Sequence, residues 1–218
     1  EVVFNTSMTG YQEVLTDPSY AGQILVMPYP LPGNYGINRI DVESRRIQVR
    51  GFVVREHCDL PSHWRSEATL HDYLARRGIP GISGVDTRAI TRRLRSVGVM
   101  MGTITSDESP QDAIARLREM PRYDNVDFVS EVSAESPYDW SGDGTPAGQA
   151  GTPGAEVSAA GPYIEVVDLG VKYNILRILR RLGCRVTAVP CKSTAEEILA
   201  LRPDGVLLSP GPGDPALL

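Results

Sequence analysis

The sequence is poor in lysine, and its apolar runs are short. Lys172 and Lys192 are the only lysines among its 22 basic residues, and the formal net charge is −5. A mildly acidic chain has no electrostatic reason to bind nucleic acid or an anionic membrane. The longest apolar stretches, such as 24–27 and 205–208, fall far short of the roughly 20 residues that cross a bilayer. We therefore expect neither a nucleic-acid partner nor a membrane partner.

The sequence also lacks the cysteine and histidine patterns of metal sites. Its three cysteines, Cys58, Cys184 and Cys191, include no C-x-x-C pair, so neither a disulfide framework nor a zinc site is indicated. The three histidines fall between positions 57 and 71 without a motif such as H-E-x-x-H. We expect no metal site, and a cytoplasmic location where thiols stay reduced.

The first 140 residues predict a mixed α/β domain. β-branched residues gather in three short runs, and good helix caps precede three amphipathic segments. The expected strands are 2–4, 23–27 and 48–54, and the expected helices are 66–77, the segment after Asp86 and the segment after Ser109-Pro110. In the last helix, Ile114 and Leu117 are expected to face inward.

The composition changes between residues 141 and 161, where Gly, Pro, Ala, Ser and Thr dominate. Such a stretch has too little apolar content to order itself, so we predict a linker. It would separate a first domain, residues 1–140, from a second one, residues 162–218.

The second domain alternates strand and helix patterns. Its expected strands are 163–169, 185–189 and 205–208, and its expected helices are 173–182 and the segment opened by a capping box at Ser193–Glu196. This alternation predicts a parallel sheet with right-handed crossovers. A doubly wound sheet normally has five or more strands, so we expect this one to be incomplete in the chain.

The strongest functional signal is the run from Ser209 to Pro215, Ser-Pro-Gly-Pro-Gly-Asp-Pro, directly after the last expected strand. Open α/β sheets bind ligands at this edge. Gly211 and Gly213 would let the main chain approach a ligand, with their N–H groups facing developing negative charge. Asp214 is expected to accept a hydrogen bond from the loop's own backbone. The alternative is a rigid turn that binds nothing.

This run resembles the oxyanion loop of class I, triad-type glutamine amidotransferases. Five further stretches resemble signature stretches of the carbamoyl phosphate synthetase small subunit; they are 4–13, 16–23, 33–36, 81–88 and 168–177. The resemblance implies a swivel-type mixed α/β domain joined by a linker to part of a doubly wound, parallel-sheet amidotransferase domain.

The same resemblance implies a function. Members of this family are expected to hydrolyse L-glutamine through a Cys-His-Glu triad and to pass ammonia to a large, ATP-using subunit. That partner would make carbamoyl phosphate from bicarbonate for arginine and pyrimidine synthesis. ATP and Mg are expected on the large subunit, and no cofactor is expected in this one.

Carried over by motif, the resemblance makes Ser19, Gly211 and Gly213 glutamine-binding residues, with the Gly211 N–H as an oxyanion donor. Lys172 matches a family lysine, for which a contact at an interface and plain surface charge are equal alternatives. The triad is expected beyond Leu218, and no cysteine here has the sequence context of the nucleophile. We therefore expect this chain alone to be inactive as a glutaminase.

Two other functions stay open at this point. The chain could be a non-catalytic docking module for the large subunit, or it could belong to another class I glutamine amidotransferase.

Overall fold

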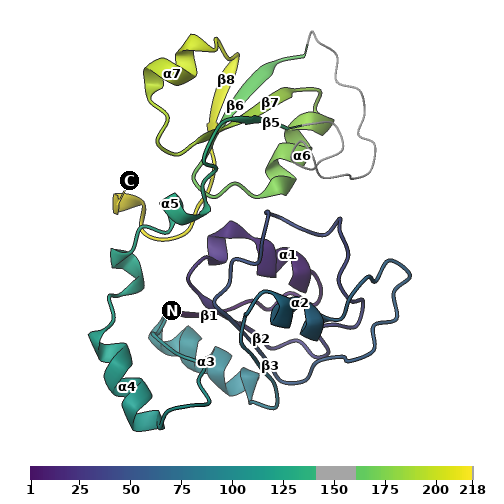
Figure 1. Cartoon of the computed structure of the whole chain (residues 1–218), viewed down its shortest axis with the longest axis vertical. Helices are drawn as coiled ribbons and strands as arrows, with labels where there is room; N and C mark the ends of the chain where they lie inside the picture. Colours follow the sequence, from purple (N-terminus) through teal and green to yellow (C-terminus); the bar gives the residue numbers. More distant parts are fainter. Residues whose placement is uncertain (141–160, 218) are drawn as a thin grey trace.

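Two sheets, one in each half of the chain, organise the molecule (Figure 1). A computed structural model describes residues 1–140 and 161–217. Most of the predicted linker, residues 141–160, lies outside the described residues. The α/β fold class expected from the sequence is confirmed.

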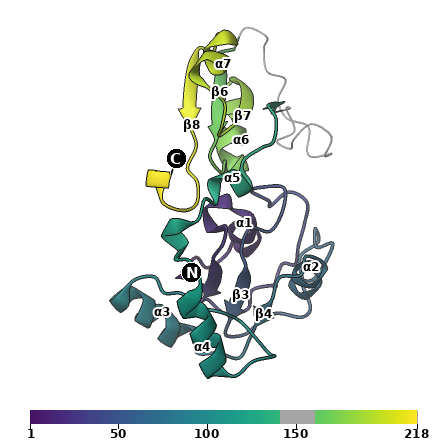
Figure 2. The ribbon, with the colours of Figure 1, turned by 60° about the vertical axis from the view of Figure 1, so that its left-hand side comes forward.

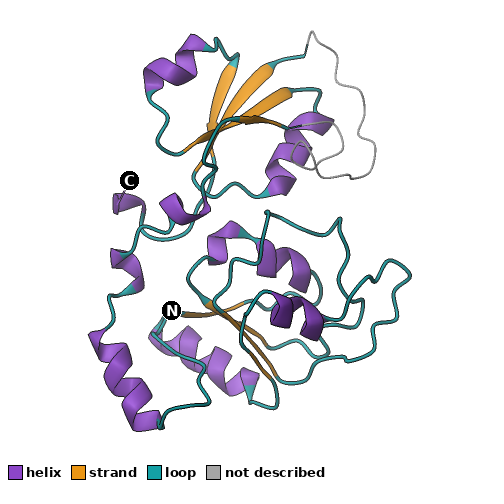
Figure 3. Cartoon of the chain, in the orientation of Figure 1, coloured by secondary structure: helices purple, strands orange, loops and turns teal. Residues whose placement is uncertain are grey.

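The first sheet has four parallel strands in the order β1-β2-β3-β4. They are β1 (Val2–Phe4), β2 (Ile24–Met27), β3 (Gly51–Val54) and β4 (Gly81–Ile82). The central strands β2 and β3 are buried on both faces, which explains their continuous apolar sequences. Long loops connect the elements of this unit (Figure 3).

Alternate residues of the central strands face opposite helical layers. Leu25 and Phe52 contact α1 (Tyr11–Thr16) and α2 (Leu70–Arg76). Val26 on the other face packs with Ile90 of the helix α3 (Thr87–Val97). This two-residue period places one core on each side of the sheet.

The helix caps show which helix starts were predicted correctly from the sequence. Asp86 accepts a hydrogen bond from the Ala89 N–H at 2.9 Å, as expected of an N-cap. The helix expected from Ser66 instead begins at Leu70, because Thr69 caps it and Ala68 forms a β-bridge with Ile37.

Helix α4 (Pro110–Glu119) begins after the predicted Ser109 cap. The inward orientation expected for Ile114 is wrong, since that side chain is 50% exposed. The reason is that α4 lies at the outer edge of the first unit (Figure 2) and buries only Ala113.

The chain then crosses to the second unit through three short elements. They are η2 (Tyr123–Asn125), α5 (Val129–Val132) and β5 (Tyr138–Asp139). β5 pairs antiparallel with a strand of the second sheet, and Trp140 is 1% exposed in that unit's core. The second sheet therefore includes residues that the sequence assigned to the first domain.

The second sheet has the order β5-β7-β6-β8, and β6, β7 and β8 are parallel. These strands are β6 (Tyr163–Asp168), β7 (Arg185–Pro190) and β8 (Gly205–Leu208). One face packs on α6 (Tyr173–Arg181), whose Leu176 is fully buried against Val166 and Val186.

Helix α6 buries only a narrow apolar face, formed by Tyr173 and Leu176. Ile178 and Leu182 are 45% and 72% exposed. The capping box of α7 (Ala195–Ala200) is formed by Thr194 and Glu197, one residue later than expected. The short helix η3 (Pro215–Leu217) follows β8 and its loop.

Glu165 gives the second unit a testable pH dependence. Its side chain on β6 is buried, and within the described residues Oε2 has no hydrogen-bond partner. Burial raises its pKa, so the folded chain holds the proton more tightly than the unfolded chain. The free energy of unfolding should therefore fall as pH rises from the ordinary glutamate pKa through the raised one.

We expect Glu165→Gln to unfold at higher urea than the original chain at about pH 8 and to match it more closely at about pH 4. Urea titrations at both values would measure this difference. The control is Glu196→Gln on α7, where the side chain is exposed. Parallel stability profiles for Glu165→Gln and the original chain would contradict the prediction.

Candidate functional site

The loop Ser209–Pro215 is fixed at its start by hydrogen bonds to the end of β6. The Ser209 N–H donates to the Val167 carbonyl at 3.1 Å. The Ser209 hydroxyl accepts from the Leu169 N–H at 3.0 Å and donates to the Pro210 carbonyl at 2.9 Å. Ser209 is 4% exposed, so it anchors the loop and is not available to a ligand.

Gly211 must be glycine because the loop touches the backbone of the neighbouring turn. A Cβ at this position would lie 1.9 Å from the Leu169 carbonyl oxygen, a distance that no side chain tolerates. Gly213 has a φ of +79°, the left-handed region that favours glycine. The Asp214 carboxylate accepts from the Ala216 N–H at 2.9 Å, so the local hydrogen bond expected of Asp214 forms, with a donor in the residue just after the loop.

The turn beneath the loop is held by a buried carboxylate. Asp168 Oδ1 accepts from the N–H groups of Gly170 and Val171 at 3.0 and 2.7 Å. Its Oδ2 accepts from the Ala134 N–H at 2.9 Å. The carboxylate therefore fixes the Leu169 backbone on which Gly211 packs.

Ser19 lies in the short helix η1 (Pro18–Tyr20) of the first unit. Asp17 caps this turn, with Oδ1 accepting from the Ser19 N–H at 2.9 Å. Oδ2 of the same carboxylate pairs with the Lys172 ammonium of the second unit at 3.2 Å. Lys172 therefore lies at the domain interface. The same Asp17 carboxylate links it to the backbone of Ser19.

A second carboxylate of the first unit caps helix α6. Glu43 Oε2 accepts from the Asn174 N–H at 2.7 Å, and the Tyr173 N–H donates to the Glu43 carbonyl at 3.0 Å. Arg177 lies 3.4 Å from Oε1 and donates to the Val42 carbonyl at 2.8 Å. Burial raises the pKa of Glu43, while the Asn174 N–H and the cations nearby oppose this shift.

One aromatic side chain packs on the turn after Ser19 and lies next to the loop. Phe128 packs so closely on Gly22 that a Cβ there would lie 2.3 Å from its ring. A Cβ on Gly213 would lie 4.0 Å from the same ring. Figures 1 and 2 agree, since the chain after β8 passes beside α5 at the boundary between the units. The structure thus brings the neighbourhoods of Ser19 and Gly213 together.

A cavity of about 310 Å³ opens at the same domain interface. Pro18 and Asp168, neighbours of Ser19 and Leu169, both line it. Arg45, Val132 and Tyr173 contribute further walls. Its lining includes none of Ser19, Gly211 and Gly213, so this cavity lies next to the predicted glutamine-binding residues and is not formed by them.

The structure describes the surroundings of the three cysteines. All are free thiols; the Cys58 thiol donates to the Leu60 carbonyl at 3.3 Å, and Cys184 is buried beside Val186. The described residues hold no group of three or more His, Cys, Asp or Glu side chains placed for a metal ion. In the same part of the chain, no helix is long and apolar enough to cross a bilayer.

Sequence reasoning singled out the loop glycines and Ser19 but missed the groups that position them. Asp17 had a local signal, because an acidic residue before proline is typical of a helix start. Glu43 had none, since its contacts are 131 and 134 residues away in the sequence. Phe128 could not be found either, because only the folded chain brings Gly22 next to it.

Comparison with family models defines the class of protein. Residues 1–104 match "Carbamoyl-phosphate synthase small chain, CPSase domain". Residues 165–218 match "Glutamine amidotransferase class-I". The chain thus joins a small-chain CPSase domain to amidotransferase sequence that contains the Ser209–Pro215 loop.

Curated relatives agree with both matches. The carbamoyl phosphate synthase small chain of Solidesulfovibrio magneticus is 49% identical over all of this chain and 58% of its own length. That of Syntrophotalea carbinolica is 50% identical over 99% of this chain and 57% of its own. The pyrimidine-specific small chain of Bacillus subtilis is 49% identical over 99% and 54%. This chain belongs to the carbamoyl phosphate synthase small chain family and spans rather more than half the length of these relatives.

The contacts of Glu43 with α6 should stabilise the junction between the two units. Glu43→Ala removes the acceptor for the Asn174 N–H and leaves Arg177 with fewer partners, so we expect a loss of about 2–3 kcal/mol in the free energy of unfolding. Glu43→Gln keeps an acceptor oxygen and should lose much less. Urea denaturation at neutral pH would measure both variants.

The matched control is Glu67→Ala. Glu67 pairs with Arg39 on the surface, with side chains 49% and 81% exposed, so its loss should cost under about 1 kcal/mol. Equal effects of Glu43→Ala and Glu67→Ala would mean that the cap does not join the units.

Proposed function

We propose that this chain supplies the glutamine-binding part of a glutamine-hydrolysing small subunit, with the substrate held between the Ser209–Pro215 loop and the Ser19 turn. The observation that carries this proposal is the position of Phe128, which packs on Gly22 and lies next to Gly213. Without that proximity, residues from two different domains could not share one substrate.

The chemistry assigned to the loop is electrostatic. Gly211 lies at the surface of the loop, while Pro212 beside it is buried. In the proposal, the Gly211 N–H donates to the oxygen that becomes negative when the glutamine amide is attacked. Gly213 and the Ser19 hydroxyl bind the rest of the glutamine molecule. Prolines on either side of Gly211 stiffen the loop, so little reorganisation is needed.

In the whole protein, the released ammonia would pass to a large, ATP-using subunit that makes carbamoyl phosphate from bicarbonate. The names of the relatives support a small chain that works with a larger one. The name of the Bacillus subtilis relative, a pyrimidine-specific small chain, favours a role in pyrimidine synthesis, and arginine synthesis is the second expected use.

The cofactors ATP and Mg are assigned to the large subunit, and no cofactor is assigned to this chain. The location proposed is the cytoplasm.

The docking-module alternative makes a different prediction for the full-length protein. The triad is assigned to sequence beyond Leu218, so the 218-residue chain should release no glutamate above background. The full-length chain with its large subunit should release it. A full-length protein without glutaminase activity would favour the docking module.

The loop itself can be tested in that full-length complex. Gly211→Ala should lower kcat for glutamine hydrolysis by about 10²-fold, because the Cβ would displace the loop from Leu169 and move the oxyanion donor. The control is Gly81→Ala on β4, where the nearest atom would be an ordinary 3.4 Å away.

Ser19→Ala should act on binding. Removing one hydroxyl that contacts bound glutamine should raise KM about tenfold with a smaller change in kcat. Steady-state glutaminase assays measure both constants. Wild-type kinetics in both Ser19→Ala and Gly211→Ala would overturn the proposed site.

A further inference from the structure

The cavity of about 310 Å³ at the domain junction has walls from three parts of the chain. Arg45 and Gln48 belong to the first unit, Glu135 and Tyr138 to the segment that crosses between the units, and Tyr173 begins α6. Its volume lies near the lower limit for small-molecule sites, so its ligand would be small. What it can bind depends on which polar groups around it are free.

Some of these polar groups already have partners in the protein. The Asp168 carboxylate accepts hydrogen bonds from three backbone N–H groups. Gln48 Nε2 donates to the Ser44 hydroxyl oxygen at 2.8 Å, and that hydroxyl donates to the Thr16 carbonyl. These groups form the wall of the cavity and would not bind a ligand directly.

Two phenol hydroxyls at the cavity have no such partner. In residues 1–140 and 161–217, neither the Tyr138 hydroxyl nor the Tyr173 hydroxyl forms a hydrogen bond with the protein. Tyr173 is only 6% exposed, and buried polar groups are nearly always paired. Burial raises the pKa of both phenols, so both are protonated at neutral pH and can donate. Since the described residues supply no acceptor, the acceptor would come from a molecule in the cavity.

Two opposite charges line the same cavity without pairing. In the described part of the chain, Arg45 forms no ion pair with a carboxylate, and Glu135 forms none with a cation. Both side chains are exposed. A guanidinium binds a carboxylate through parallel N–H groups, and a carboxylate attracts an ammonium group. A ligand with one carboxylate and one ammonium group would match both charges.

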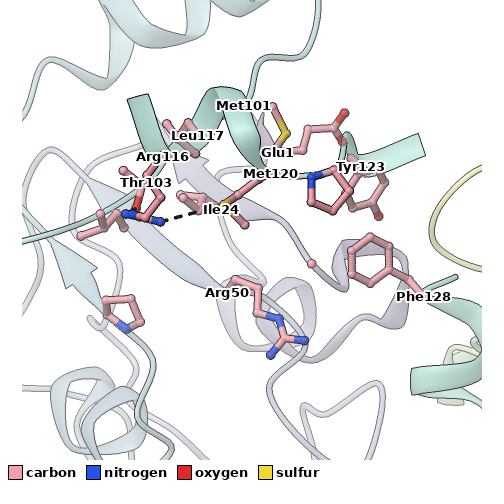
Figure 4. Close-up of a pocket in the computed structure, with 15 residues that line it drawn as sticks. Glu1, Ile24, Arg50, Met101, Thr103, Arg116, Leu117, Met120, Tyr123 and Phe128 are labelled. Carbon is pink, nitrogen blue, oxygen red and sulfur yellow. Dashed lines mark hydrogen bonds between the residues drawn. The ribbon is translucent and has the colours of Figure 1, made fainter. Parts of the chain in front are cut away.

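A larger cavity, of about 350 Å³, lacks these free groups. Figure 4 shows Arg50, Arg116 and Tyr123 among its lining residues. Each of the two arginines pairs with a glutamate, and the Tyr123 hydroxyl donates to the Ala21 carbonyl at 2.9 Å. The protein itself satisfies these polar groups, so the junction cavity is the better candidate for a polar ligand.

We propose that the junction cavity binds a small amino acid, as a second ligand distinct from the glutamine of the proposed function. Arg45 and the two phenols donate to its carboxylate, and Glu135 accepts from its ammonium group. The apolar part of the wall, which would face a short side chain, consists of Pro18, Val132 and Val171. The inference does not depend on where glutamine binds.

Three probes with related skeletons test the assignment by isothermal titration calorimetry on the full-length chain with its large subunit. L-alanine has both charged groups, propionate lacks the ammonium group, and ethylamine lacks the carboxylate. We expect L-alanine to bind at least about tenfold more tightly than either analogue, because each hydrogen bond to a charged group contributes more than a neutral one. No binding of L-alanine, or equal binding of either analogue, would overturn the proposal.

Two variants test whether the binding occurs in this cavity. Arg45→Gln removes the guanidinium charge. Tyr173→Phe removes one donor but keeps the ring, which packs on Trp140 with the centroids 4.7 Å apart. Each substitution should weaken L-alanine binding about tenfold or more. Unchanged binding in both variants would mean that L-alanine binds elsewhere, which refutes the site.

The matched controls are Arg88→Gln, at an exposed position of α3, and Tyr163→Phe on β6. The Tyr163 hydroxyl lies 3.2 Å from both Glu165 and Thr187. Neither control residue lines the cavity, so both variants should bind L-alanine as the original protein does. Equal losses in the controls and in the cavity variants would contradict the assignment.

Thermal unfolding separates a lost ligand contact from a damaged fold. Without ligand, Tyr173→Phe should not lower Tm, because the hydroxyl that it removes has no partner among the described residues. A clear fall in Tm would show that the protein already uses this hydroxyl, and its proposed role would then be wrong.

Ser19→Ala separates this cavity from the proposed glutamine site. Ser19 does not line the cavity, so the variant should bind L-alanine with the original affinity even though its KM for glutamine rises. Loss of L-alanine binding in Ser19→Ala would place the amino acid in the glutamine site and would overturn the inference of a second ligand.

Discussion

The arrangement of the two units depends on two carboxylates of the first unit that bind the start of α6 and the residue before it. Lys172, at the N-cap of α6, gives the helix no side-chain cap, so Glu43 supplies one from across the interface. A helix N-terminus carries partial positive charge and unpaired N–H groups. A carboxylate is attracted by this charge and accepts hydrogen bonds from these N–H groups. Asp17 binds Lys172 beside it. The start of α6 is thus completed by groups that are distant in the sequence.

This joint connects directly to the candidate site. Asp17 caps the turn of Ser19 with one oxygen and binds Lys172 with the other. Lys172 follows the turn that Asp168 stabilises, and the Ser209–Pro215 loop is bonded to that turn through Leu169. A shift of one unit against the other would therefore change the relation between Ser19 and the loop. The polar contacts at the interface are part of the geometry that would bind substrate.

The sequence predicted elements whose signals are local. The strands β1, β2 and β6, and the caps at Asp86 and Ser109, follow from β-branched runs and from capping chemistry. Errors arose where tertiary contacts decide the outcome. Ile114 has the right periodicity for a core position, but none of the described elements covers that face of α4.

The same division holds for the site. Gly211 and Gly213 were found because a dense run of glycine and proline after a strand is visible in the sequence. The more distant groups around the site were not found, since Glu43 and Phe128 make contacts that lie 85 or more residues away in the sequence. Local patterns in a single sequence give no signal for contacts between residues so far apart. Only the folded backbone brings these residues into contact.

The ends of the segment 141–160 are fixed to the same strand. The Trp140 N–H donates to the Val186 carbonyl at 2.9 Å, and the Arg185 N–H donates to the Pro162 carbonyl at 2.8 Å. The chain therefore leaves and rejoins the second sheet at adjacent residues of β7. Because both ends are bonded to one strand of the second sheet, a peptide inserted between residues 141 and 160 would be attached to that unit alone and would not act on the contacts between the two units.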